Sequence, residues 1–231
     1  MKKVLFSTVA LLAFGFVNAQ DLKSKKGEAY LPVAGEWAIS FNADGIFEYA
    51  GNAFNGNTDN AAPSVTSVRQ NTFVGKKFIT DKTAYRVVAN LRAGSNSSTN
   101  LVGVETTNSN FGLTAGLGKE WRKGKTRLQG FYGADALAFF NTGSEKTVTG
   151  ASTVTRTPGL ELGLGVNGFV GAEYFIFPKM SLGAQFSYGF NLGVVGKDKL
   201  DNNGTVTESG GGSSVGLSGV SVQSINLNLH F

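Results

Sequence analysis

A strict alternation of apolar residues with small or polar ones constrains the fold of this chain more than any other feature. It is clearest over residues 181–192, where every even position is apolar and every odd position is serine, glycine, glutamine or asparagine. Successive side chains of a β-strand point to opposite faces, so this segment has one apolar and one polar face. The pattern returns in residues 225–231. The sequence therefore predicts an all-β protein.

The N-terminus has the features of a cleaved secretory signal peptide. Lys2 and Lys3 precede an apolar run over residues 4–17, and Ala19 is a small residue at the cleavage position before Gln20. An uncleaved anchor is the alternative, but the run is shorter than the about 20 residues that a spanning helix needs. No later stretch of the sequence reaches that length, so a membrane form of this protein would have to cross with strands.

The composition excludes several classes of function. The chain has no cysteine, which removes disulfides and thiolate chemistry. Its formal charge of +5 falls to +3 without Lys2 and Lys3, and no basic cluster points to nucleic acid. The 32 glycines and 18 phenylalanines fit a curved sheet better than a disordered chain. We expect no cofactor and no metal ion.

Eight segments have the alternation of strands, and the connections between them are alternately long and short. The predicted strands cover about residues 36–43, 71–79, 84–93, 110–121, 126–140, 159–176, 181–195 and 225–231. The long connections, rich in Asn, Ser, Thr and Gly, cover about residues 44–70, 94–109, 141–157 and 196–218. This asymmetry is typical of outer-membrane barrels, whereas a soluble β-sandwich, the alternative, has no reason to alternate so regularly.

The chain is therefore expected to divide into three parts. These are a signal peptide at residues 1–19, a periplasmic lead at residues 20–35 and an outer-membrane β-barrel domain at residues 36–231. The expected fold is an eight-stranded antiparallel up-and-down transmembrane β-barrel of a Gram-negative cell.

Aromatic residues at the short-turn end support the membrane assignment independently. Such side chains gather at membrane–water interfaces. The predicted periplasmic girdle consists of Trp37, Tyr85, Trp121, Phe175, Phe177 and Phe231. The second strand is ambiguous, because Lys76 and Lys77 are adjacent and one of them must face lipid if the strand is regular. The alternation does not decide which of the two faces lipid.

The inward positions of the predicted strands hold charges of both signs, and enclosed charges are costly unless they are paired. The predicted internal charge network consists of Glu36, Arg86, Arg92, Glu120, Arg127, Asp135, Glu161 and Glu173. With a turn at residues 122–125, Glu120 would lie opposite Arg127, and Phe131 opposite Gly116. We expect the first pair to form a salt bridge and the second to fill space with an aromatic ring.

Many other inward positions are glycine. They include Gly112, Gly116, Gly118, Gly133, Gly163, Gly165, Gly171, Gly183 and Gly189. These glycines either leave a narrow water path or a small ligand cavity, or they relieve crowding and help the sheet to bend. We favour the second interpretation, because an eight-stranded barrel holds little more than its own side chains.

On these features the chain resembles the small eight-stranded outer-membrane barrels of the OmpA transmembrane-domain and OmpX type, porin-family proteins of the Bacteroidetes kind. The resemblance rests on the Ala19–Gln20 junction, the loop asymmetry and the terminal strand. It implies that the barrel-assembly machinery reads an alternating C-terminal signal, here Ile225, Leu227, Leu229 and Phe231. It also implies contact with outer-membrane lipid and lipopolysaccharide. Fold does not settle function in such a family.

The expected function is a non-enzymatic barrel that anchors polar surface loops, in a structural, adhesive or partner-binding role. We expect a monomer whose partner binds the loops, and no nucleic acid. The main alternative is a narrow porin or small-solute carrier. A third is a lipid-modifying enzyme, but His230 is the sole histidine and would lie at the periplasmic end.

The last long connection contains oxygen-bearing side chains that could bind calcium. They are Asp198, Asp201, Asn202, Asn203 and Glu208. Their spacing does not fit an EF-hand, and such Asn/Asp/Gly clusters usually form turns. We therefore assign no metal site.

Overall fold

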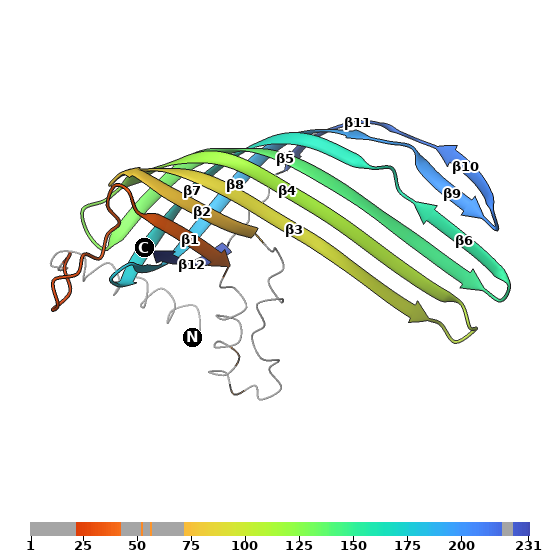
Figure 1. Cartoon of the computed structure of the whole chain (residues 1–231), viewed down its shortest axis with the longest axis horizontal. Coiled ribbons are helices and arrows are strands. Elements are labelled where there is room, and N and C mark those ends of the chain that lie inside the picture. Colours follow the sequence, from red (N-terminus) through yellow and green to blue (C-terminus); the bar gives the residue numbers. More distant parts are fainter. Residues whose placement is uncertain (1–21, 43–51, 53–55, 57–71, 219–223) are drawn as a thin grey trace, which may run out of the picture.

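The computed structural model describes residues 22–42, 52, 56, 72–218 and 224–231, and its strands form one antiparallel sheet (Figure 1). The twelve strands are β1 (Trp37–Asn42), β2 (Thr72–Thr80), β3 (Thr83–Thr99), β4 (Glu105–Lys123), β5 (Leu128–Thr149), β6 (Ser152–Thr157), β7 (Glu161–Phe177), β8 (Met180–Val195), β9 (Asp198–Asn202), β10 (Thr205–Ser209), β11 (Gly212–Ser218) and β12 (Ser224–His230). Within the described part, no helix is long and apolar enough to span a membrane. The predicted signal peptide at residues 1–19 lies outside the described residues.

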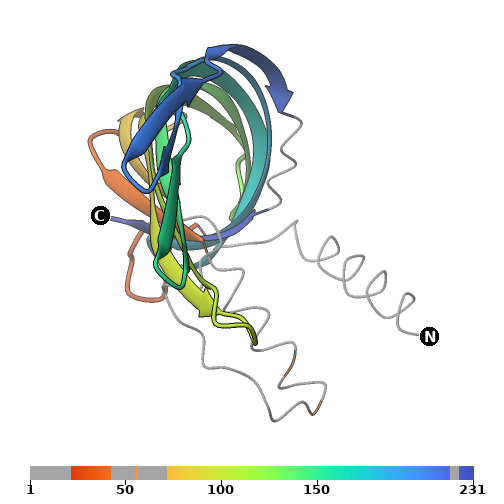
Figure 2. The ribbon, with the colours of Figure 1, turned by 90° about the vertical axis from the view of Figure 1, so that its right-hand side faces the viewer.

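Eight of these strands close into a ring. Each pairs with the next in the order β1, β2, β3, β4, β5, β7, β8 and β12, and β12 pairs again with β1. The view along the long axis shows the ring directly (Figure 2). The expected all-β, antiparallel, up-and-down arrangement is confirmed, and every predicted strand corresponds to one strand of the ring.

Beyond the ring, the sheet continues where the sequence predicted loops. Strands β3, β4 and β5 extend together past the ring, and β6, β9 and β10 add to their edge (Figure 1). We call residues 94–110, 142–157 and 198–209 the distal sheet. Strand β11 pairs with β8. Three of the four predicted loops are therefore largely strand, while the fourth, at residues 44–70, lies outside the described residues except for residues 52 and 56.

Most outward side chains of the ring are apolar, and its carboxylates point inward. Leu117 and Leu164, at outward positions, are 69% and 67% exposed. Glu120 and Glu173, at inward positions, are 0% and 1% exposed. This is the sidedness that the alternation predicts, and it is the reverse of a soluble protein, in which charged residues are almost never fully buried.

The register of the β4–β5 hairpin differs from the predicted one. Glu120 lies opposite Gly133, six residues beyond Arg127, so the expected Glu120–Arg127 salt bridge is wrong. Gly116 lies opposite Leu137 rather than Phe131. The difference arises because β4 continues through Arg122 and Lys123, which the sequence analysis assigned to the turn.

The inward glycines of the ring accommodate large side chains from the neighbouring strand. Phe131 of β5 lies opposite Gly171 of β7, and its ring occupies the space that a Cβ at Gly171 would take. Phe139 occupies the corresponding space at Gly163. The rule that a ring fills space above a cross-strand glycine is therefore confirmed, although the sequence analysis chose the wrong partner for Phe131.

Residues 22–36, most of the predicted lead, lie at the short-turn end of the ring. The Arg127 guanidinium lies over the buried ring of Tyr30, 3.6 Å from the ring centroid. The backbone oxygen of Leu31 accepts a hydrogen bond from Lys179 Nζ at 3.1 Å. The Gly35 backbone N–H donates to Phe78 O at 2.8 Å. The segment thus contacts the β4–β5 connection, the β7–β8 turn and strand β2.

Candidate functional site: the interior of the ring

Six charged side chains meet inside the ring, toward the short-turn end. Three are cations and three are carboxylates, and none is more than 3% exposed. We call this group the charged floor: Lys76, Arg86, Arg122, Glu120, Asp135 and Glu173. They come from β2, β3, β4, β5 and β7, where strand alternation directs each of them inward. The formal charges balance.

Glu120 is the centre of one half of the floor. Its Oε2 lies 2.9 Å from Lys76 Nζ and 2.8 Å from an Arg86 guanidinium nitrogen. Its Oε1 lies 3.7 Å from Arg122. Arg86 reaches further, with Nε 3.2 Å from Asp135 Oδ1. One carboxylate therefore compensates parts of three cations, and a second carboxylate completes the pairing of Arg86.

Glu173 organises the other half. One of its oxygens pairs with Arg122, which reaches across β5 from β4. Its Oε2 accepts hydrogen bonds from Ser181 Oγ at 3.2 Å and Asn228 Nδ2 at 3.1 Å. Ser40 of β1 in turn donates to Asn228. With these partners, every strand of the ring contributes a polar side chain to one connected network.

Aromatic rings pack on the charged floor. Phe78, Phe175 and His230 form a layer with ring centroids 5.6 Å apart for Phe78–His230 and 5.1 Å for Phe175–His230. The Arg122 guanidinium lies over Phe78 and Phe175, at 5.3 and 5.8 Å. On the Arg86 side, Phe169 contacts the guanidinium at 3.8 Å. These rings fill the space between strands that small inward residues would leave open.

The structure places four of the eight predicted network residues in the charged floor. They are Arg86, Glu120, Asp135 and Glu173. The other four, Glu36, Arg92, Arg127 and Glu161, lie elsewhere. Glu36 pairs with Lys179 at 2.6 Å near the short turns, and Arg127 packs on Tyr30. Arg92 lines the cavity described below, and Glu161 accepts a hydrogen bond from Asn141 at 2.9 Å. Arg92 and Glu161 thus face the interior, but outside the charged floor.

Two floor residues were missing from the prediction. Lys76 is inward and Lys77 outward, which settles the phase that the sequence left open. Arg122 was assigned to a turn, although it follows Glu120 by two residues and so shares its face in a continuing strand. Extending the alternation by one step would have found it.

A cavity of about 650 Å³ lies on the other side of the charged floor, toward the distal sheet. Its wall combines neutral amide and hydroxyl groups, including Asn90, Thr114 and Asn167, with apolar side chains such as Leu137 and Phe139. Lys76, Arg86 and Asp135 line the part of the cavity that borders the charged floor. The interior therefore has a closed, charge-paired end and a polar, open-volume end.

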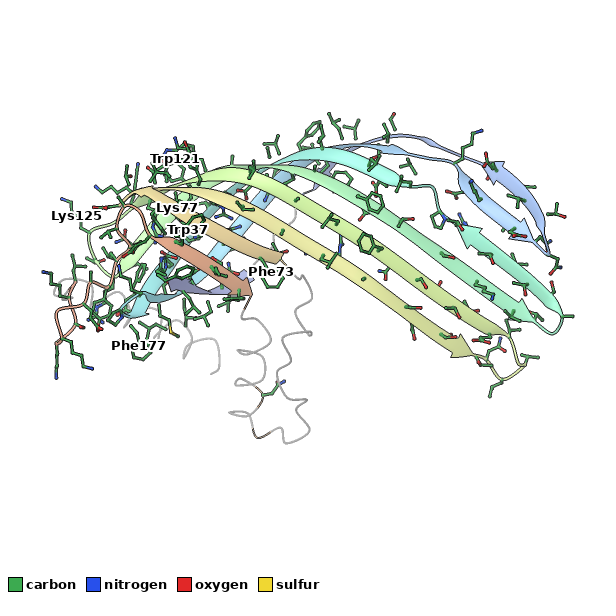
Figure 3. The ribbon with its side chains drawn as sticks, in the orientation of Figure 1. Trp37, Phe73, Lys77, Trp121, Lys125 and Phe177 are labelled. Atoms are coloured by element: carbon green, nitrogen blue, oxygen red, sulfur yellow. The ribbon has the colours of Figure 1, made fainter. Side chains whose placement is uncertain are left out.

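The outward aromatic girdle has five of its six predicted members. Trp37, Tyr85, Trp121, Phe177 and Phe231 are 50%, 55%, 38%, 58% and 64% exposed. Phe175 is a correction, because it is fully buried against His230 inside the ring. It shares the inward phase of Glu173, and a register irregularity between Phe175 and Phe177 then brings Phe177 outward. Figure 3 shows Trp37, Trp121 and Phe177 near the short-turn end.

The C-terminal residues predicted as an assembly signal lie on the outer face of β12 and just beyond it. Ile225, Leu229 and Phe231 are exposed, and Leu227 is half-buried. His230, between them in sequence, points inward and is 5% exposed. Its two ring nitrogens have no hydrogen-bond partner among the described residues.

The oxygen-bearing side chains of the last predicted loop serve the distal sheet. Asp198 accepts hydrogen bonds from the Gly159 backbone N–H at 2.9 Å and from Arg156 at 3.1 Å, and these two bonds lower the pKa of its carboxyl. Asp201 accepts from the Gly204 backbone N–H at 2.7 Å in the β9–β10 turn. The turn-forming interpretation accounts for the Asp201 contact, whereas Asp198 connects β9 to Arg156 of β6 and to Gly159.

No protein-family model matches the chain, and no curated protein or solved structure matches it.

Proposed function

We propose that this protein is an eight-stranded transmembrane β-barrel of the bacterial outer membrane, and that it is a non-enzymatic anchor for a polar surface sheet. The observation that carries the proposal is the inversion of the ring, with apolar side chains outside and a charge-paired network inside. Exposed apolar surface of this extent around a closed ring marks a membrane or interaction surface. A closed ring also leaves no strand edge unpaired in hydrocarbon.

The outward side chains continue around the whole ring. Large exposed apolar residues lie on every one of its strands except β5, where Tyr132 is the large exposed ring. They include Ile39, Phe73, Val87, Leu113, Leu164, Phe186 and Ile225. A soluble sandwich would turn these faces toward a second sheet, whereas here they encircle a polar interior. Hydrocarbon is the solvent that suits such a surface.

The distal sheet supports the anchoring role. It projects past the ring on the side opposite the short turns, where outer-membrane barrels carry their longer external segments (Figure 1). Hydroxyl ladders cross its strands, such as Ser95 with Ser109 and Ser97 with Thr107, both at 3.0 Å. A polar sheet held at this end would meet the medium and present the partner-binding surface of the protein.

The export, the outer-membrane location and the reading of the C-terminal signal by the assembly machinery are parts of the same proposal. The signal-peptide features of residues 1–19 and the outward Ile225, Leu229 and Phe231 support them. A monomeric state and lipid contact around the ring belong to the same proposal.

Migration on detergent gels tests the fold and the location together. Unheated protein from outer-membrane fractions should migrate at a different apparent mass from boiled protein, because a closed barrel resists detergent unfolding. A cysteine-free soluble periplasmic control should not shift. Recovery of the protein in the soluble periplasm, with no heat-dependent shift, would refute the proposal.

A narrow porin or small-solute carrier is the second candidate, and the 650 Å³ cavity favours it. The charged floor and the Phe78–Phe175–His230 layer oppose it, because they fill the interior at the short-turn end. The anchor proposal therefore expects no stable single-channel openings in planar bilayers. Reproducible openings from folded, heat-shifting protein would refute the sealed anchor and support the porin or carrier function.

A further inference from the structure

Aromatic residues and lysines alternate in a row on the outer face of the ring, near the short turns. Trp37 of β1 pairs in register with Lys77 of β2, Lys77 pairs with Tyr85 of β3, and Tyr85 pairs with Lys119 of β4. The row therefore crosses four neighbouring strands at one level. Figure 3 shows Trp37, Lys77 and Trp121 close to this end of the ring.

The lysines of this row lie on aromatic rings. Lys77 Nζ is 4.5 Å from the Trp37 ring centroid, and Lys119 Nζ is 5.2 Å from that of Trp121 and 6.0 Å from that of Tyr85. A third lysine extends the group, with Lys123 Nζ 5.7 Å from the Tyr132 ring. We call these three lysines and four rings the lysine–aromatic patch.

The patch lacks a protein counter-charge. Lys77 Nζ donates one hydrogen bond, at 2.6 Å, to the backbone oxygen of Gly35. Within the described part of the chain, none of the three ammonium groups lies in a salt bridge. No aspartate or glutamate occupies an outward ring position of β1, β2, β3, β4 or β5. Three positive charges thus stand together on an otherwise apolar wall.

The patch is confined to one side of the ring. The outward residues of β7, β8 and β12 in the ring carry no charge, as the runs Leu162–Tyr174 and Leu182–Val194 show at every second position. A uniform belt of lysines would suit any interface. The three lysines, one on β2 and two on β4, instead mark one place on the circumference.

We propose that the lysine–aromatic patch binds an anionic phospholipid through its phosphate. This inference rests on the proposed function, because it needs the ring to lie in a membrane. Trp and Tyr rings lie at the headgroup level of a bilayer, so lysines resting on them lie at the level of the lipid phosphates. The backbones of Lys77 and Lys119 are two strand spacings apart, roughly 10 Å, with Tyr85 on the strand between them. One lipid headgroup placed over Tyr85 would therefore have a lysine on each side.

The side of the membrane follows from the fold. The patch lies at the short-turn end, which the proposed function places toward the periplasm, in the leaflet that faces inward. The occupant is therefore a diacyl phospholipid with a net negative headgroup, such as phosphatidylglycerol. Basic clusters beside membrane-spanning segments bind such headgroups electrostatically.

The two tryptophans of the chain, Trp37 and Trp121, both belong to the patch, so they report lipid binding without a label. Folded protein is placed in phosphatidylcholine vesicles in which one fifth of the lipid is brominated in its acyl chains near the headgroup. The brominated lipid is either phosphatidylglycerol or phosphatidylcholine. Bromine on an acyl chain quenches only when lipid itself is adjacent, so free phosphate cannot imitate the result.

Brominated phosphatidylglycerol should quench about twofold more strongly than brominated phosphatidylcholine, because each lysine near an anionic headgroup favours its binding several-fold. The triple variant K77Q/K119Q/K123Q should quench equally with both lipids, and K119Q alone should lose part of the difference. The matched control K146Q/K197Q/K199Q removes the same charge from the other end of the molecule and should keep the wild-type preference.

The outcomes separate this inference from the proposed function. Equal quenching of the wild-type protein by both brominated lipids would overturn the lipid site and leave the barrel intact. No quenching by either lipid, in protein that does not shift on heating, would overturn the barrel itself. A preference that survives in the triple variant would also reject the patch as its cause.

Discussion

A buried carboxylate such as Glu120 persists only because its partners are fixed by several strands. Lys76, Arg86 and Arg122 approach it from β2, β3 and β4, so that no single pair carries the charge alone. Removing one member of a buried pair costs more than the pair contributes, because the remaining charges lose their compensation. Exposed or half-exposed pairs are worth far less.

Replacing this carboxylate should therefore be costly. Glu120→Gln leaves three buried cations with less counter-charge, and we expect a loss of about 3–5 kcal/mol in the free energy of unfolding. Urea titration of the folded protein in vesicles, followed by the heat-dependent gel shift, measures it. Glu36→Gln, which breaks the half-exposed pair with Lys179, is the matched control and should cost about 1 kcal/mol or less. Equal losses would contradict the central role of Glu120.

The inward glycines make a second prediction at this scale. In Gly171→Ala the new methyl group would collide with the ring of Phe131 and with the backbone of β8, and overpacking of this kind costs about 1–3 kcal/mol. Gly75→Ala, where nothing lies within 4 Å of the new Cβ, should change stability little. Urea midpoints of the two variants compare them directly. A neutral Gly171→Ala would show that the ring has room to move.

At the scale of elements, the sequence predicted the ring strands because one face of each must be apolar and the other polar. It did not predict β6, β9, β10 and β11, since these short strands contain only one or two apolar residues each, too few to show a period of two. The β4–β5 register failed for a different reason. Lys123 and Lys125 look like turn residues, but the pairing of β4 with β5 extends to Lys123 opposite Gly130.

Four of the six residues of the charged floor were predictable by the same logic. Arg86, Glu120, Asp135 and Glu173 follow from the phase of strands with clear alternation. Lys76 did not, because its neighbour Lys77 is equally charged. Phe175 was misplaced because its position near a turn was weighed above its inward phase.

Introduced cysteines test the register of the β4–β5 hairpin, and the chain offers a clean background because it has none of its own. Ser109 and Ser144 are register partners in the distal sheet. Directly opposed residues of antiparallel strands have Cα atoms about 4.5–5.5 Å apart, within the range of a disulfide.

S109C/S144C should therefore cross-link completely under mild oxidation, as seen by mass spectrometry after proteolysis. S109C/A138C follows the register that the sequence analysis chose and should not cross-link. Efficient bonding of the second pair alone would mean that the observed register is wrong.

The whole molecule consists of a ring and a distal sheet that share strands but little else. No pairing that closes the ring uses β6, β9, β10 or β11. The contacts of the charged floor likewise come only from ring strands. The two parts are thus continuous in backbone but independent in their stabilising side-chain contacts.

Removing the outer hairpin should then leave the ring unchanged. In a variant with residues 198–209 replaced by a short glycine-rich turn, we expect the same heat-dependent shift. Its free energy of unfolding in urea should match that of the wild type within about 0.5 kcal/mol, the scatter expected for distant sites. Loss of the gel shift would show that β9 and β10 help to close the ring.

The order in which strands supply the charged floor has a consequence for biogenesis under the proposed function. Strands β2 to β5 contribute Lys76, Arg86 and Arg122 against Glu120 and Asp135, and only β7 brings the balancing Glu173. A half-finished cylinder would carry an unmatched positive charge toward lipid, a state that hydrocarbon penalises. Electroneutrality would thus be reached only when β7 has joined, before β8 and β12 complete the ring.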